Sequence, residues 1–467
     1  MSRKRAAEDS ITAEHLTPAG TVKIFPVQKS QFGNLFSPLP TEVSVDSGRW
    51  QDYSPSQVGF TPLEFMVPKS AEFIDLNMCE IIFTCNIKAE DGATSMAGAT
   101  LDDTSVVNNF GHSLMKHMEV KFNDTSTGEP TDLQAYKAYN MVLLNFSPEQ
   151  KESFLQIEGW YDDTPGEDAV LNAVETVSTG KNKGLIERAK LFISDVGTSA
   201  SQAVKDAVFI IQPLADIFHT SRYLVPGVAI NIRITLNDPS FYMMRADGKK
   251  GRVELISAKL RIRHVKSTPS VKASIRTEMT DKNKVAIYPI RTTKPIVRIL
   301  NKGVSSFNFN DIFQQHLPDR LTIAMVSAEA YNGDYTKNPF NYRFFGLEGM
   351  KVLVNGAEVP LTRYKFKSPD YVEGYETLFS ATRMHRGKGI GISRADYKNV
   401  FALLDLNLSP DGKDVSGYTY KKNEGTVDLD FTFKAGLTEN VAMIISPEFE
   451  NELMIDPLRV VRLRKNY

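Results

Sequence analysis

The sequence predicts an all-β fold made of two similar sandwiches in tandem, and three observations support this prediction. Aromatic residues are abundant, with 17 Tyr and 27 Phe among 467 residues, a composition that favours strands over helices. Short apolar or alternating runs recur along the chain, separated by Gly, Pro and Asn clusters. A particular motif, an alternating run that ends in an Asn turn and leads to an aromatic helix, occurs in each half of the chain.

The repeated motif is predicted to be a β-hairpin followed by a helix. Each copy alternates into an Asn turn that tolerates the positive φ of a type I′ hairpin. Sixteen residues beyond that Asn lies a Tyr within an amphipathic helical pattern. The first copy has a hairpin at 118–124, a capping box from Thr131 to Gln134, and the helix residues Tyr136, Tyr139, Leu143 and Phe146. The second copy has a hairpin at 350–356, a helix start at Ser368-Pro369, and the helix residues Tyr371, Tyr375, Leu378 and Phe379.

Other strand-like segments fill both halves, and the last three of each half follow in the same order. We predict about eight strands per half, interrupted by a helix and long loops, which is typical of a jelly roll and not of a short-turned meander. The expected fold is therefore two tandem eight-stranded jelly-roll sandwiches, a double jelly roll, with short helices and long loops. Besides the hairpins, the predicted strands are 60–67, 73–87, 208–211, 228–236 and 253–265, then 285–288, 296–300, 320–326, 401–408, 426–433 and 441–449.

Composition also divides the chain into parts. The N-terminal part is rich in Pro, Ser, Gln and Thr and is predicted to be an arm that buries little surface. The polar segment 160–206 is much longer than an ordinary connection, so we expect it to run over the surface and not to enter the core. The predicted parts are an N-terminal arm (1–58), a first jelly roll (59–267), a linker (268–283), a second jelly roll (284–457) and a basic C-terminal tail (458–467).

Charge and cysteine usage exclude several classes of function. Lys plus Arg (55) nearly cancels Asp plus Glu (56), so the body of the protein is not a general polyanion binder. Cys79 and Cys85 lie about 20 Å apart if their strand is extended, too far for a disulfide, and are predicted to be small core residues. The start of the chain lacks the apolar core of a secretory signal, and no run of about 18 apolar residues predicts a membrane span.

Candidate chemical sites in the sequence are weak. His112 and His117 are an odd number of residues apart and would point to opposite faces of a strand, which argues against a cupin-type metal site. The adjacent pairs Asp102-Asp103 and Asp162-Asp163 do not face each other across a cleft, as glycoside hydrolysis would require. The Gly387–Gly391 segment lacks the long helix that a phosphate cradle needs. We therefore predict no catalytic residue, no metal ligand and no cofactor, and a protein that is not an enzyme.

Both ends of the chain are basic, and two explanations are left open. The basic residues could provide solubility and protect an edge strand against unwanted pairing. They could instead lie together on one side of the molecule and contact a polyanion such as packaged DNA by counterion release. The residues concerned are Arg3, Lys4, Arg5, Arg459, Arg462, Arg464 and Lys465.

Several ordered blocks resemble the major capsid proteins of Maverick/Polinton elements and adintovirus-like viruses. The similarity spans about residues 60 to 456, and its specificity comes from the number of blocks and their order. The matching blocks are 73–76, 108–114, Trp160-Tyr161, 222–228, 332–341, Tyr371, Tyr375, Leu378-Phe379, 391–397 and 406–411.

The resemblance implies a structural subunit of a virion. Members of that family form homotrimeric, pseudo-hexagonal capsomers that tile an icosahedral shell around DNA, and they have no catalytic residues to carry over. It implies as partners two further copies of the chain, neighbouring capsomers, penton and minor capsid proteins, and DNA at the basic termini. It also implies that the long loops at 89–105 and 160–206 project outward and join the trimer. The implied location is the virion capsid, with synthesis in the host cytoplasm and assembly in the nucleus as one route.

Two other classes of function stay open at this stage. A two-domain carbohydrate-binding or glycan-cleaving β-sandwich protein would show glycan binding and turnover. A cupin-type metalloenzyme would carry a bound metal that elemental analysis detects.

Overall fold

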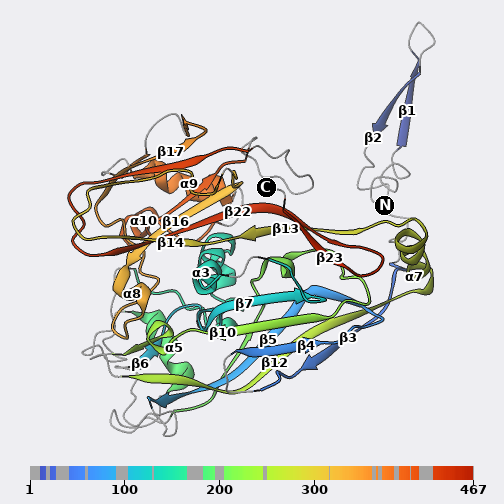
Figure 1. Ribbon diagram of the computed structural model, residues 1–467, viewed down its shortest axis with the longest axis horizontal. Helices are drawn as coiled ribbons and strands as arrows, with labels where there is room; N and C mark the ends of the chain where they lie inside the picture. The colour runs from blue at the N-terminus through green and yellow to red at the C-terminus, as the bar shows by residue number, and fades with distance from the viewer. Residues whose placement is uncertain are drawn as a thin grey trace.

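The computed structural model describes residues 11–16, 22–27, 42–57, 62–90, 104–128, 131–165, 182–194, 204–245, 250–314, 316–359, 364–366, 371–382, 389–399, 401–409 and 424–465. At the N-terminal end, β1 (Ile11–Leu16) and β2 (Val22–Val27) form an antiparallel hairpin that Figure 1 draws apart from the body. The other described elements build two β-sandwiches, which we treat in turn.

The first sandwich consists of two four-stranded antiparallel sheets. Strands far apart in sequence are neighbours in each sheet, because the chain crosses repeatedly from one sheet to the other. Sheet 1a has the order β3 (Val45–Tyr53), β12 (Gly251–Ser267), β5 (Phe73–Ala89) and β9 (Ala207–Ile211), and sheet 1b has the order β4 (Leu63–Val67), β10 (Ile230–Leu236), β7 (Met115–Phe122) and β8 (Thr125–Ser126).

The second sandwich repeats this topology and adds three strands, β14, β19 and β23. Its two sheets again alternate early and late strands in the same relative order. Sheet 2a has the order β13 (Ala286–Thr293), β22 (Val441–Ile455), β16 (Arg320–Ser327) and β20 (Leu403–Asn407), and β14 (Ile296–Leu300) and β23 (Val461–Lys465) also pair with β22. Sheet 2b has the order β15 (Ser306–Phe309), β21 (Val427–Phe433), β17 (Leu347–Val354) and β18 (Ala357–Glu358), and β19 (Tyr364–Lys365) also pairs with β17.

This match confirms the predicted double jelly roll. β9, β10 and β12 correspond in sheet position to β20, β21 and β22, as the order of the late strands predicted. Both predicted hairpin turns are present, because Asn123 and Asp124 have φ values of 45° and 68°, and Asn355 and Gly356 have φ values of 53° and 77°. The duplication is therefore one of topology as well as of sequence motif.

The helices that follow the hairpins are also present, although one predicted cap is wrong. α3 (Gln134–Asn145) and α9 (Val372–Thr382) carry the two aromatic patterns. No capping box forms at α3. Thr131 Oγ1 accepts from the backbone N–H of Leu133, and the Gln134 side chain points to Leu214 O, 3.5 Å away. A capping box between Ser147 and Gln150 does form at the start of α4 (Pro148–Lys151), where Gln150 Oε1 accepts from Ser147 N over 2.9 Å.

Shorter elements connect and cover the two sandwiches. β3 comes from the stretch assigned to the arm, but its residues pair with β12, so they belong to sheet 1a. The polar linker forms a helix, α7 (Pro269–Arg276), that continues into a π-helical turn, η5 (Thr277–Asp281). The remaining elements are β6 (Thr104–Val106), β11 (Met243–Arg245), α2 (Phe110–Ser113), η2 (Phe154–Glu158), α5 (Lys183–Phe192), η3 (Asp216–His219), α6 (Pro239–Tyr242), α8 (Ala328–Asn332) and α10 (Arg394–Asn399).

The sandwiches pack side by side, with α3 between them. In Figure 1, α3 lies between β7 of the first sandwich and the β13–β22–β16 part of sheet 2a. A hydrophobic cluster spans this junction and includes residues of both halves, whereas a second cluster fills the interior of the second sandwich. Within the described part of the chain, none of the helices is both long and apolar enough to cross a membrane.

Candidate functional site

Aromatic contacts and a buried hydrogen bond hold the two sandwiches together at their junction. The Tyr139 ring of α3 stacks on the Phe340 ring of the second half, with centroids 4.1 Å apart and planes 6° from parallel. Tyr342 packs edge-on against Tyr139, and its hydroxyl donates to Asn140 Oδ1 over 2.8 Å. Burial raises the pKa of Tyr342 well above its ordinary value. These contacts join the halves into one body.

A buried lysine also bridges the junction. Lys151 Nζ donates to Leu143 O of the first half over 2.9 Å and to Ile390 O of the second half over 2.7 Å. It also lies 5.6 Å from the centroid of the Trp160 ring. Burial lowers the pKa of Lys151 to about 8, although nearby Asp162 acts in the opposite direction. The Gly387–Gly391 segment therefore supplies, at Ile390, a contact between halves.

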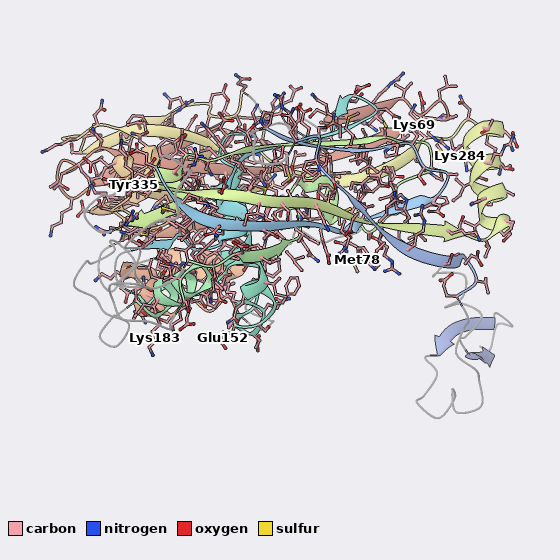
Figure 2. All side chains as sticks on the ribbon, turned by 90° about the horizontal axis from the view of Figure 1, so that it is seen from below. Lys69, Met78, Glu152, Lys183, Lys284 and Tyr335 are labelled. Carbon is pink, nitrogen blue, oxygen red and sulfur yellow. The ribbon has the colours of Figure 1, made fainter. Side chains whose placement is uncertain are left out.

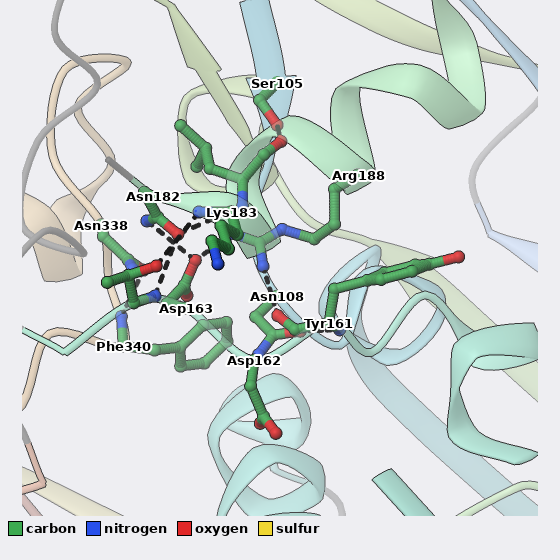
Figure 3. Close-up of polar contacts among 12 residues, drawn as sticks. Ser105, Asn108, Tyr161, Asp162, Asp163, Asn182, Lys183, Arg188, Asn338 and Phe340 are labelled. Atoms are coloured by element: carbon green, nitrogen blue, oxygen red, sulfur yellow. Dashed lines mark hydrogen bonds and ion pairs between the residues drawn. The ribbon is translucent and has the colours of Figure 1, made fainter. Parts of the chain in front are cut away.

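The segment 160–206 contributes to the core, so its predicted surface course is wrong for the described parts. Trp160 is 1% exposed and Arg188 of α5 is fully buried. The Arg188 guanidinium donates to Tyr161 O and to Asp163 Oδ1, each over 2.6 Å (Figure 3). It also donates to Val106 O over 2.9 Å. A buried charge of this kind is stable because a carboxylate and two carbonyls surround it.

Local chemistry explains how α5 reaches this position. The Asn182 side chain caps the helix, with Oδ1 accepting from Leu185 N over 3.3 Å. At Gly184 the chain passes so close to Asp162 that a Cβ would lie 2.3 Å from its carbonyl oxygen. Only glycine fits there without displacing backbone.

The predicted weak sites are structural where they are described. Asp162 is exposed and accepts from the Trp160 indole over 2.8 Å, whereas the Asp163 side chain is buried and pairs with Arg188. Asp102-Asp103 lies outside the described residues.

The two histidines also lie in separate surroundings. His112 lies on α2, not on a strand, with Nε2 3.2 Å from Glu158 Oε2, whereas His117 on β7 lies 3.2 Å from Asp132. No group of three or more His, Cys, Asp or Glu residues could hold a metal ion in the described ranges. Cys79 and Cys85 are buried and free, as predicted, and burial raises the pKa of both thiols.

The basic residues near the C-terminus are divided between two roles. Arg459 is in the left-handed region, with φ 66°, and its Nε donates to Pro226 O of the first half over 2.7 Å. Arg462 and Arg464 are exposed on β23, and Arg464 lies 3.5 Å from Glu452. Lys465 ends β23, whereas Arg3, Lys4 and Arg5 lie outside the described residues. Arg459 is therefore a junction residue, and two residues of a strand edge remain open to solvent.

Among the described residues, the two larger cavities lie away from the contact between Tyr139 and Phe340. A cavity of about 380 Å³ beneath α7 is mainly apolar and is lined by Val45, Tyr223 and Met279 among others. A cavity of about 560 Å³ lies beside α9 and β20, lined by Val359, Glu373 and Glu376 among others. Sequence reasoning identified neither cavity, because each forms where segments distant in sequence meet.

No protein-family model matches the chain. By sequence it is similar to an uncharacterized protein of Caenorhabditis elegans, 21% identical over 435 residues that cover 90% of this chain and 97% of the relative. That identity is too low to assign a family.

Solved structures show the class of fold. The fold is similar to that of the Sputnik virophage structure determined by cryo-electron microscopy, with a TM-score of 0.64, 12% identity and coverage of 97% of this chain and 95% of that chain. The fold is also similar to a quasi-atomic model of the PBCV-1 virus capsid, with a TM-score of 0.56, 10% identity and coverage of 92% of this chain and 98% of that chain. For the crystal structure of the mavirus major capsid protein the TM-score is 0.52 and the identity 9%, with coverage of 95% of this chain and 96% of that chain. The chain thus has the double jelly-roll fold of viral major capsid proteins.

Proposed function

We propose that this chain is a major capsid protein, a structural subunit whose homotrimers form pseudo-hexagonal capsomers of an icosahedral shell. The observation that carries the proposal is the repeated topology: two sandwiches with the same strand order, fixed side by side in one chain. Three such chains place six similar sandwiches around one axis, so a threefold oligomer presents nearly sixfold edges to its neighbours. The similar capsid structures support this function, and the ordered blocks described above support a Maverick/Polinton or adintovirus-like lineage.

The test is the oligomeric state of the purified full-length chain. Light scattering should give about 155 kDa, three times the chain mass of 52.2 kDa. Negative-stain images of the same sample should show compact particles with a pseudo-hexagonal outline. A stable monomer at micromolar concentration contradicts the proposal. Neighbouring capsomers, penton and minor capsid proteins would be the partners of such a trimer, and its location would be the virion, with synthesis in the host cytoplasm and nuclear assembly.

Contact with packaged DNA is a second, separate part of the proposal. Arg462 and Arg464 lie two residues apart on β23, so they share one face of an edge strand. With Lys465 and the N-terminal Arg3, Lys4 and Arg5 they could neutralise phosphates. Replacing Arg462 and Arg464 by Ser should reduce the slope of log affinity for duplex DNA against log salt by about 2. An unchanged slope would remove these two residues from the proposal.

A further inference from the structure

The cavity beneath α7 has an apolar interior that opens to solvent. It is lined by α7 and η5, by the ends of β3, β5 and β12, by the loop before β10 and by the start of β13. In its wall, Phe73, Val225 and Val265 are buried, whereas Tyr223 and Val285 are exposed. Its volume of about 380 Å³ and its mainly apolar lining are typical of a small-molecule site.

The helix above this cavity has an apolar side with few protein partners. Val271, Ile275 and Met279 follow one another at intervals of four residues, so they share one side of the helical segment, and all three line the cavity. None of the α7 residues is buried. Apolar side chains inside proteins are normally packed to crystal-like density. An apolar molecule beneath α7 would therefore supply contacts that this side of the helix lacks.

The cavity is also elongated. Ser267 immediately precedes the start of the helical segment 268–281, and Lys284 follows its end. This segment is about 20 Å long at the helical rise per residue. Both Ser267 and Lys284 line the cavity, so the cavity runs along the helix. Its shape fits an extended chain better than a compact ring system.

The end of the cavity at Lys284 carries more positive than negative charge. Figure 2 labels Lys284 beside α7, at one end of the molecule. Glu278 pairs with both Lys282 and Lys284, with nitrogen to oxygen distances of 2.5 Å. Two arginines lie close by, because Arg222 donates to Ile287 O and the Arg459 guanidinium is 3.4 Å from Met279 Sδ. The charged residues here are thus the cations Lys282, Lys284, Arg222 and Arg459 and the anions Glu278 and Asp281.

We propose that this cavity binds a free long-chain fatty acid, with the acyl chain beneath α7 and the carboxylate at Lys284. The apolar interior takes the acyl chain, and the surplus of positive charge at the open end favours an anionic head group. The Lys284 side chain is exposed, so the carboxylate remains partly hydrated when it binds. The site is separate from the junction between the sandwiches. It does not depend on the proposed capsid function, because each chain contains the whole cavity.

The experiment measures the binding of decanoate and of decanol, its uncharged analogue, to the full-length chain after treatment with a lipid-removing resin. Isothermal titration calorimetry should show one decanoate per chain. Lys284→Gln should weaken decanoate binding about 3- to 5-fold and leave decanol binding within about 2-fold, because only decanoate carries a charge and solvent screens an exposed pair.

A second variant fills the cavity. Ser267 Oγ is buried and has no hydrogen-bond partner among the described residues, so Ser267→Leu removes no hydrogen bond. Ser267→Leu should weaken the binding of both probes at least about 10-fold, since the added side chain takes space from the acyl chain. Val271→Trp, on the helix without buried residues, fills the cavity from the other side and serves the same purpose if circular dichroism shows that Ser267→Leu is misfolded.

The matched control is Lys69→Gln. Lys69 is exposed at the same end of the molecule but does not line the cavity (Figure 2), so this variant should bind both probes as the original chain does. Unchanged decanoate binding in a folded cavity-filling variant overturns the site. If Lys284→Gln weakens decanoate and decanol equally, or neither, the position of the carboxylate is wrong. An original chain that binds phosphatidylglycerol vesicles but not decanoate has a membrane-binding surface in place of a fatty-acid site. None of these outcomes alters the oligomeric state that tests the capsid function.

Discussion

Sheets 1a and 2a have the same topology but opposite surroundings. Sheet 2a is buried on both faces: Ile445 faces the interior of its own sandwich, and the adjacent Ile444 faces the junction with the first sandwich. Sheet 1a is buried on one face, and Ile256 and Val208 on its other face are exposed. Two sheets of the same topology therefore need different residues on their outer faces, apolar where protein covers the face and polar where solvent does.

The strands of the two sheets record this difference in their residue patterns. β22 begins Val441-Ala-Met-Ile-Ile445, a continuous apolar run, and all of these residues are buried. The equivalent strand β12 alternates between buried apolar and exposed or partly exposed charged residues through Lys259, Leu260 and Arg261. Continuous apolar runs are typical of strands covered on both faces, and alternation is typical of strands with one wet face.

The strongest test of the difference between the two sheets is to introduce the same charged residue on the outer face of each. Ile444→Lys buries an ammonium in the junction, where the native side chain is fully inaccessible, and should lower the free energy of unfolding by about 4 kcal/mol or more. Ile256→Lys, at a position 46% exposed on the open sheet, should cost less than about 1 kcal/mol to the fold of a single chain. Urea unfolding at one fixed protein concentration measures both. Equal losses would contradict the difference between the sheets.

The helices allow a second test of the same comparison. Tyr139→Ala on α3 removes a ring stacked on Phe340 and should lower the free energy of unfolding by about 3 to 5 kcal/mol. Tyr371, sixteen residues beyond the second hairpin Asn, is only partly buried, so Tyr371→Ala should cost about 1 kcal/mol. Calorimetry on both variants gives the values. A larger effect at Tyr371 would mean that α9, and not α3, holds the halves together.

The sequence was sufficient to predict what depends on local pattern. Alternation into Asn123 and Asn355 predicted both hairpins, because positive φ restricts those positions to few residue types. The order of the late strands predicted the duplicated topology. β15 was missed because Ser306–Phe309 is short and polar in part, and β23 because its basic residues indicated a tail.

Burial of polar residues was not predictable in the same way. Asp163, Asn182 and Arg188 are polar in sequence, so segment 160–206 was expected on the surface, yet they satisfy one another inside the fold. Their partners are brought together by the tertiary structure and carry no signal in local spacing. The failed capping box at Gln134 has the same cause, because tertiary contacts override a local propensity.

The buried Lys151 at the junction should make the free energy of unfolding depend on pH. Its folded pKa of about 8 lies below the ordinary 10.5, so the unfolded chain binds the proton more tightly between these values. Stability should therefore rise with pH across this window, by up to about 3 kcal/mol for a shift of this size. In Lys151→Met this part of the rise should be absent. The measurement is the difference in unfolding free energy between the two chains at pH 7, 8, 9 and 10, and a constant difference would mean that Lys151 does not titrate there.

The smallest change in the free energy of unfolding is expected at the edge of sheet 2a. The difference between sheets 1a and 2a concerns their faces and does not extend to this edge. Arg464 is 63% exposed at its side chain and lies 3.5 Å from Glu452, a geometry in which solvent screens most of the attraction. Arg464→Ala should change the free energy of unfolding by less than about 0.5 kcal/mol. Arg459→Ala, measured alongside it, should cost more, because its guanidinium donates to Pro226 O across the junction. If the two arginine variants lost the same stability, β23 would contribute as a whole strand and the junction contact of Arg459 would be incidental.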